Sequence, residues 1–201
     1  TYTCAKTDFV DSHRYWSHPT NNNAMKKGTT SLSNKPVSMM ADSKLGIMGP
    51  LYNENVFGKP HTITEWEECQ MNPHIYESCT MMAAYASMQN WQPMYFALGI
   101  GTYLDIDQSE RGLPRTTPWD ETIDDPNQIH AFFTLHNQPV QMATMPSASL
   151  MYIRGDIKEA DKGFYNRYSQ NDYFSADNTE LSQDAALGMV GKTGTAYDGV
   201  G

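Results

Sequence analysis

The chain has 201 residues, the length of one ordinary domain or of part of a larger one. Its 14 basic and 23 acidic residues give a formal net charge of −9, which disfavours a nucleic-acid backbone or an anionic membrane as a partner. No apolar run approaches the ~20 residues of a membrane-spanning helix, so we expect neither a membrane nor a nucleic acid as partner.

The first elements expected are a strand, a long loop and a short helix. "TDFVDSH" (residues 7–13) is typical of a short buried strand, with polar residues at its C-terminal end. Residues 16–43 are rich in Asn, Ser, Thr, Lys and Pro, which predicts a loop. A short helix is expected over 43–55, interrupted at Gly49-Pro50. The start has no signal-peptide pattern and runs almost at once into a strand, which is typical of the middle of a longer protein.

Two strand-helix steps follow. β-Branched residues predict a strand over "KPHTITEW" (59–66), and apolar residues predict another over "PMYFALGI" (93–100). Between them, "ESCTMMAAYASMQNW" (77–91) predicts a helix. Its apolar stripe has helical spacing and is interpreted as core packing: Met81, Met82, Tyr85 and Met88. This alternation predicts an α/β fold with a parallel sheet and crossover helices.

The second half of the chain gives weaker signals. Residues 102–138 are expected to be mostly irregular. A helix is predicted over 139–151, beginning at Pro139 and kinked or offset at Pro146. "MYIRGDI" (151–157) could form a further strand, and the polar segment beyond it shows no firm element.

The three cysteines give no metal pattern. Cys4, Cys69 and Cys79 form neither a CxxC pair nor an even disulfide set. Cys69 and Cys79 could form a disulfide or remain ordinary thiols, and the sequence does not decide between these alternatives. A metal site is a weaker alternative. It would use four histidines, but their spacing puts no two of them on a shared helical face: His13, His18, His61 and His74. We therefore expect no metal and no cofactor.

Functional side chains are expected at the C-terminal tips of the three strands, where reacting groups gather in parallel α/β folds. The tips carry these residues: Asp11, His13 and Tyr15 on the first, Glu65 and Trp66 on the second, Tyr95 and Phe96 on the third. Side chains alternate with period two along a strand. His13 and Tyr15 are therefore expected to face the same pocket that Glu65 enters.

Glu65 fits the nucleophile of a sugar-cleaving site. A glycosidic bond that breaks through an oxocarbenium-like transition state needs a carboxylate on one face and an acid that protonates the leaving oxygen on the other. Hydrogen bonds from His13 and Tyr15 would keep Glu65 ionised and oriented. Trp66 offers a flat apolar surface for a pyranose ring.

Structural interpretations compete at each of these positions. A glutamate at a strand end is commonly a plain surface residue, and a histidine such as His13 commonly makes a structural hydrogen bond. Glu67 and Glu68 are interpreted as a solvated rim, because adjacent acids on a strand point apart. Taken one by one, these residues do not decide the function.

Five ordered blocks of the sequence together resemble a known family. They are "DFVDSHRYWSHP", "SNKPVSMM", "GKPHTITEWEECQMNPHIYESCTMMAAYASMQNW", "PMYFALGI" and "QPVQMATMPSASLMYIRGDIKEA", within residues 7–160. In this order they resemble the last strands of clan A glycoside hydrolases, the cellulase-like and mannanase-like barrels related to family 5. The resemblance implies a TIM (β/α)8 barrel, with strands six to eight in residues 1–155. A polar C-terminal extension, or the start of an accessory β domain, would follow in 156–201.

The resemblance also assigns roles. The strand-six His-x-Tyr matches His13 and Tyr15, and the strand-seven nucleophile matches Glu65. These matches imply a retaining hydrolase of a β-linked polysaccharide or oligosaccharide, extracellular or periplasmic. In the clan, the general acid is a glutamate after an asparagine at the end of strand four. The only Asn-Glu before Glu65 is Asn53-Glu54, in the connection after strand six. The acid and the N-terminal half of the barrel are therefore expected upstream, so the chain alone should be inactive.

The surface that would bind the sugar and the catalytic role itself both have an alternative interpretation. The family often has a sugar-stacking tryptophan on strand eight, where this sequence has Tyr95 and Phe96. The alternative function is a non-catalytic carbohydrate-binding or scaffold protein that retains the barrel. It predicts sugar binding through Trp16, Trp66 and Tyr95 that does not depend on Glu65.

Overall fold

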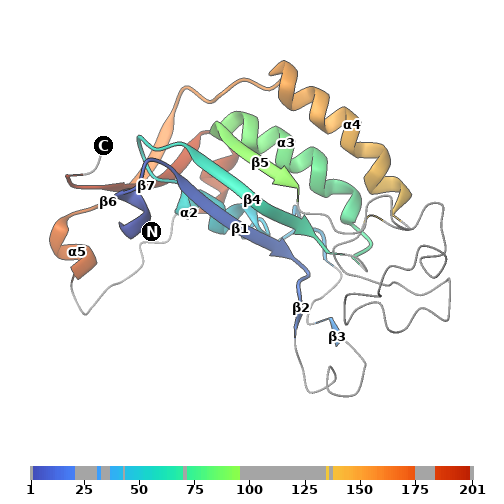
Figure 1. Cartoon of the computed structure of the whole chain (residues 1–201), viewed down its shortest axis with the longest axis horizontal. Coiled ribbons are helices and arrows are strands. Elements are labelled where there is room, and N and C mark those ends of the chain that lie inside the picture. The colour runs from blue at the N-terminus through green and yellow to red at the C-terminus, as the bar shows by residue number, and fades with distance from the viewer. Residues whose placement is uncertain are drawn as a thin grey trace, which may run out of the picture.

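The computed structural model describes residues 2–20, 31–32, 37–42, 44–69, 72–95, 135, 138–174 and 184–199. In this part of the chain the fold is mixed α/β, with parallel strands in small sheets and no closed barrel (Figure 1). The main sheet has three parallel strands in the order β1-β4-β5: β1 (Val10–Trp16), β4 (His61–Glu68) and β5 (Trp91–Tyr95). The expected combination of helices with a parallel sheet is therefore present.

The three predicted strands correspond to β1, β4 and β5, with shifted ends. β1 begins at Val10 and continues to Trp16, beyond the predicted end, whereas β5 begins at Trp91. Residues 96–100 of the third predicted strand lie outside the described residues. In the register between β1 and β4, His13 lies opposite Glu65, after an irregularity between Asp11 and His13. The first and second strand tips are thus direct neighbours.

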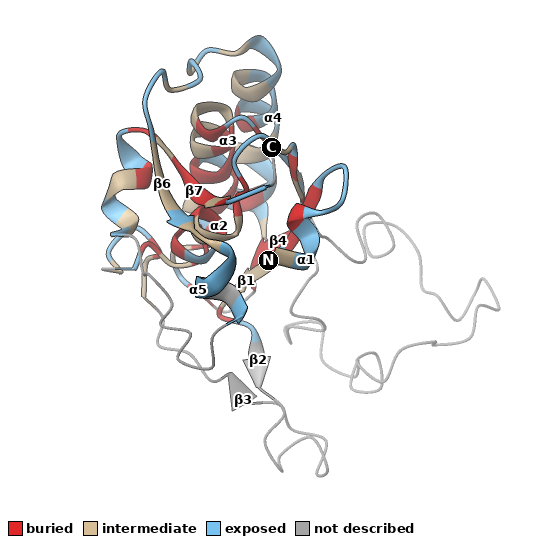
Figure 2. Ribbon diagram, turned by 90° about the vertical axis from the view of Figure 1, so that its left-hand side faces the viewer, coloured by how far each residue is buried: buried red, intermediate tan, exposed pale blue. Residues whose placement is uncertain are grey.

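Helices cover one face of this sheet. Three of them contribute to a single buried cluster: α2 (Met48–Glu54), α3 (Ser78–Gln89) and α4 (Pro139–Arg154). Ile63 of β4 and Trp91 of β5 enter the same cluster from the sheet. Figure 2 shows the buried positions gathered in α3 and the strands beside it. Met81 and Met82 are buried here, so the core role predicted for the methionine stripe is confirmed at these positions.

Three prolines lie in the described helices, and two of them are in a first turn. Pro50 was expected to interrupt a helix, and this prediction is wrong because Pro50 lies in the first turn of α2. The first four backbone N–H groups of a helix have no intrahelical acceptor, so a proline there loses no hydrogen bond. Pro139 opens α4 as predicted, and α4 continues through Pro146 to Arg154.

The predicted strand at 151–157 is absent. Met151–Arg154 form the last turn of α4, which ends at Gly155 in the left-handed conformation, with a φ of 62°. Glycine adopts this conformation without a side-chain clash and commonly terminates helices. A short apolar run does not by itself distinguish a strand from the end of a helix, and here the position of the glycine shows that it is a helix end.

The described part of the C-terminal segment contains two strands, where no firm element was expected. β6 (Gly163–Tyr168) and β7 (Lys192–Tyr197) pair in parallel as a separate two-stranded sheet. The remaining short elements are α1 (Tyr2–Ala5), β2 (Pro19–Thr20), β3 (Ser31–Leu32), η2 (Ile75–Glu77), α5 (Gln170–Phe174) and η4 (Ala185–Met189). Among the described helices, none is long and apolar enough to cross a bilayer. Apart from residues 135 and 138, the predicted irregular stretch 102–138 lies outside the described residues.

Gln89 at the end of α3 ties this C-terminal segment to the helices. Its buried side chain donates to the backbone carbonyls of Gly188 (3.0 Å) and Gly191 (2.7 Å). Its carbonyl oxygen accepts from the backbone N–H of Thr193 (2.9 Å). Asn55, after α2, likewise donates to the carbonyl of Thr193 at 2.7 Å. Buried amide side chains therefore hold β7 and η4 against the rest of the fold.

We predict that Gln89→Ala lowers the free energy of unfolding by about 3 kcal/mol, since each of these hydrogen bonds contributes about 1 kcal/mol. Urea denaturation followed by tryptophan fluorescence measures the change. Gln92→Ala is the matched control, because Gln92 is exposed on β5 and should alter stability by less than about 0.5 kcal/mol. Equal stability of the two variants would contradict the role given to Gln89.

Candidate active site

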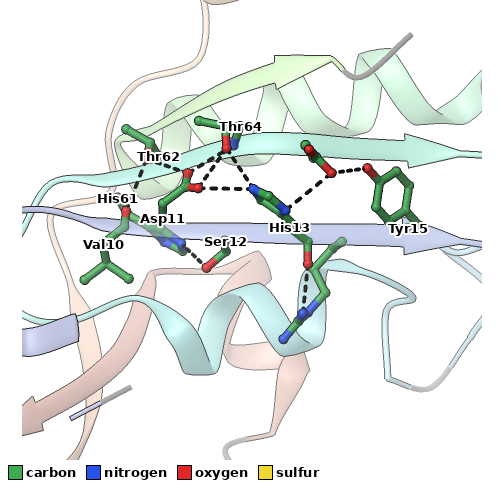
Figure 3. A network of polar contacts seen from close by, with 10 residues as sticks. Val10, Asp11, Ser12, His13, Tyr15, His61, Thr62 and Thr64 are labelled. Carbon is green, nitrogen blue, oxygen red and sulfur yellow. Dashed lines mark hydrogen bonds and ion pairs between the residues drawn. The ribbon is translucent and has the colours of Figure 1, made fainter. Parts of the chain in front are cut away.

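The structure brings His13, Tyr15 and Glu65 together, as the sequence predicts. The Tyr15 hydroxyl donates to Glu65 Oε2 at 2.5 Å. Nδ1 of His13 lies 3.3 Å from the same oxygen. Figure 3 shows the His13 and Tyr15 side chains reaching from β1 toward β4. Because β1 and β4 are parallel and adjacent, two side chains of β1, from its middle and its C-terminal half, converge on one carboxylate of β4.

This cluster is open to solvent. The side chains of His13 and Glu65 are 48% and 36% exposed, whereas the cluster of Ile63 and Trp91 is covered by helices. Burial, followed by the hydrogen bond to Glu65, raises the pKa of Tyr15, so its hydroxyl remains a donor over the ordinary pH range. The site thus presents a carboxylate that is held by neighbouring groups and can be reached from outside.

Asp11, which we expected at the same strand tip without a specific role, is part of the same network. Its carboxylate lies 3.2 Å from Nε2 of His13 and accepts hydrogen bonds from Thr62 and Thr64 of β4. The period-two spacing of residues 11, 13 and 15 was the available signal, because it places all three on one side of the strand. The two threonines could not be matched to Asp11 without the register of the sheet.

The aromatic residues proposed to bind sugar lie elsewhere. Trp66 is 4% exposed and packs edge-to-face against Tyr95, with ring centroids 4.8 Å apart. Tyr95 also accepts a hydrogen bond from the buried Gln141 of α4. Trp16 donates its indole N–H to the carbonyl of Val37 at 2.9 Å and packs against the main core. Trp66 therefore exposes no ring face for a sugar, and the positions of all three aromatics fit core packing. Phe96 lies outside the described residues.

Glu67 and Glu68 are buried, so their interpretation as a solvated rim is wrong. Burial raises the pKa of Glu67 to about 9, with partial lowering by the Tyr95 hydroxyl. Burial and then the charge of Glu77 raise the pKa of Glu68 to about 8. Adjacent strand residues do point to opposite faces, but both faces are covered at this end of β4. The alternation of side chains along a strand could not predict that the second face of β4 is also buried at this end.

The cysteines near these acids are thiols. Cys69 and Cys79 are buried and free, and burial raises the pKa of each, that of Cys79 to about 11. No group of three His, Cys, Asp or Glu side chains suited to a metal ion occurs among the described residues. His61 is buried away from the open cluster, with its Nε2 2.9 Å from the Ser12 hydroxyl, and burial lowers its pKa to about 4. It is therefore neutral near pH 7.

No family model, curated protein or solved structure matches this chain. A function can therefore be proposed only from the chemistry of the site. Its central group is a solvent-accessible carboxylate whose Oε2 is contacted by a phenol and an imidazole. Such a carboxylate can attack an electrophilic carbon or remove a proton from a bound molecule.

The buried carboxyls generate a pH prediction. In the folded state the Glu67 and Glu68 carboxyls keep protons that the unfolded chain loses above the ordinary pKa of 4.5. The contribution of these two carboxyls to the free energy of unfolding is fully present below that pH. It decreases as the pH rises toward 8 to 9, because only the unfolded chain loses the protons in this range. Glu67→Gln removes one ionising group, so we expect it to exceed the wild type in unfolding free energy by at least about 1 kcal/mol at high pH.

Urea denaturation at several pH values measures this effect. The difference between Glu67→Gln and the wild type should be smallest at a pH well below the ordinary glutamate pKa, where both side chains are neutral in both states. Glu159→Gln is the control, since Glu159 is exposed and pairs with Lys192. A destabilised Glu67→Gln at high pH would show that the Glu67 carboxylate is ionised and paired in the folded protein.

Proposed function

We propose that the protein is a retaining glycoside hydrolase that cleaves a β-linked polysaccharide or oligosaccharide, with Glu65 as nucleophile. One observation carries the proposal. The Glu65 carboxylate, in the C-terminal half of β4, is contacted by Tyr15 and His13 of the parallel strand β1, the pair that the family resemblance assigns to this task.

The arrangement suits nucleophilic attack. Among the described residues, both contacts are to Oε2, which leaves Oε1 as the oxygen available to attack the anomeric carbon. A bond from Glu65 to the sugar would form as the glycosidic bond breaks, and the leaving oxygen would take a proton from a second carboxylic acid. Water then releases the sugar and regenerates the carboxylate, with net retention of configuration.

The second acid is expected from another part of a longer protein. Glu54, of the Asn-Glu pair noted in the sequence, is bound to Arg14. We infer that the main sheet is strands six to eight of a barrel, for two reasons. Its strands are parallel and lie side by side in chain order, and helices cover one face while the other carries the polar cluster. The missing strands would supply the acid, about 5–5.5 Å from Glu65.

Glu65→Gln in the full-length protein tests the role of the nucleophile. We expect hydrolysis of soluble β-glucan, β-mannan or β-xylan to fall by roughly 10⁴-fold. Calorimetric binding of the same glycan should persist, because the amide keeps the shape of the side chain. Glu159→Gln, a change of an exposed glutamate remote from the site, should retain the wild-type rate.

Unchanged turnover in Glu65→Gln would remove Glu65 from the chemistry. Proton NMR of the first product formed gives a second test, since retention predicts that the product keeps the β configuration. Glycan binding by the wild type without hydrolysis of any of the three polymers would favour the non-catalytic carbohydrate-binding alternative.

A further inference from the structure

Asp11 is held rigidly by the neighbouring strand. Its Oδ1 accepts from the Thr62 hydroxyl at 2.7 Å and from the backbone N–H of Thr64 at 3.2 Å. Its Oδ2 accepts from the Thr64 hydroxyl at 2.7 Å (Figure 3). Partial burial opposes ionisation, but these donors outweigh it and lower the pKa of Asp11 below its usual value. Asp11 is therefore a fixed carboxylate beside His13.

His13 lies between this carboxylate and that of Glu65. Its Nε2 is 3.2 Å from Asp11 Oδ2 and 3.0 Å from Thr64 Oγ1, and its Nδ1 is 3.3 Å from Glu65 Oε2. The Thr64 hydroxyl has one hydrogen, which is directed at Asp11. Nε2 thus faces two acceptors and is a donor. Nδ1 faces the Glu65 carboxylate, which is also an acceptor, so a hydrogen on either ring nitrogen has a partner.

We propose that Asp11 is a positioning residue that acts through His13: it fixes the imidazole ring so that Nδ1–H donates to Glu65. The catalytic part of this inference rests on the proposed function, whereas the orientation of the ring does not. Asp11 itself contacts no reacting atom, and no bond forms or breaks at it. Its effect is to keep a donor aimed at the nucleophile, as outer carboxylates do for histidines in other sites.

A purely structural role for Asp11 makes a different prediction. Asp11 also joins β1 to β4 at the irregularity in their register, so its loss could simply loosen the sheet. Thr62 separates the two roles, since its hydroxyl binds Oδ1 of Asp11 while His13 faces Oδ2. Thr62→Val weakens the same strand connection without removing the carboxylate that faces the imidazole.

The experiment compares Asp11→Asn with Thr62→Val in the full-length protein, using the β-glycan that the wild type hydrolyses. We expect Asp11→Asn to lower kcat by roughly 10- to 100-fold. KM and the melting temperature should stay near the wild-type values, and Thr62→Val should keep the wild-type kcat.

In ¹⁵N–¹H NMR spectra, the His13 ring should have both nitrogens protonated in the wild type and in Thr62→Val. Asp11→Asn should lose the Nε2 proton. The signals are assigned by their loss in His13→Gln.

Identical kcat and His13 spectra in Asp11→Asn and the wild type would overturn the proposal, as would equal losses of kcat in Asp11→Asn and Thr62→Val. If Asp11→Asn does not fold, Thr64→Val takes its place, because the Thr64 hydroxyl contacts both Asp11 and Nε2 of His13. It should change kcat and the ring spectra in the same direction. A wild type that hydrolyses no glycan sinks the proposed function, and the His13 spectra then decide the role of Asp11 by themselves.

Discussion

His13 and Glu65 face each other across the parallel strands β1 and β4, and the rest of the site depends on this register. It brings the Tyr15 hydroxyl to the same carboxylate oxygen and places Asp11 against Thr62 and Thr64. A shift of one residue would turn the polar side chains of one strand toward the buried cluster under the helices and away from their partners on the other strand. The buried cluster formed by α2, α3, α4 and the sheet fixes the register from the opposite face.

β4 also places three glutamates in two opposite environments. Glu65 is accessible and receives donors, whereas Glu67 and Glu68 are fully buried. No hydrogen-bond partner for the Glu68 carboxyl is found in the part of the chain that the structure describes. Burial disfavours the charged form of a carboxyl, and donors favour it. Environment, and not residue type, therefore separates the candidate nucleophile from its neighbours.

The sequence predicted the features that depend on local pattern. Alternation and β-branched residues located β1 and β4, the methionine stripe located α3, and the period-two spacing placed His13 and Tyr15 on one side. What failed depended on contacts between distant segments. The cover over Glu67 and the core position of Trp66 require knowing which elements pack on β4. The order of the C-terminal segment depends on Gln89, about a hundred residues earlier in the chain.

The central claim, that Glu65 forms a bond with the sugar, is tested most directly by trapping that bond. A 2-deoxy-2-fluoro glycoside with a dinitrophenolate leaving group needs little help from a general acid, and its fluorine slows release of the sugar. Peptide mass spectrometry of the treated full-length protein should find one sugar, attached to Glu65, and none in Glu65→Gln. A sugar attached to another carboxylate, or a protein that hydrolyses glycan without ever being labelled, would contradict the account.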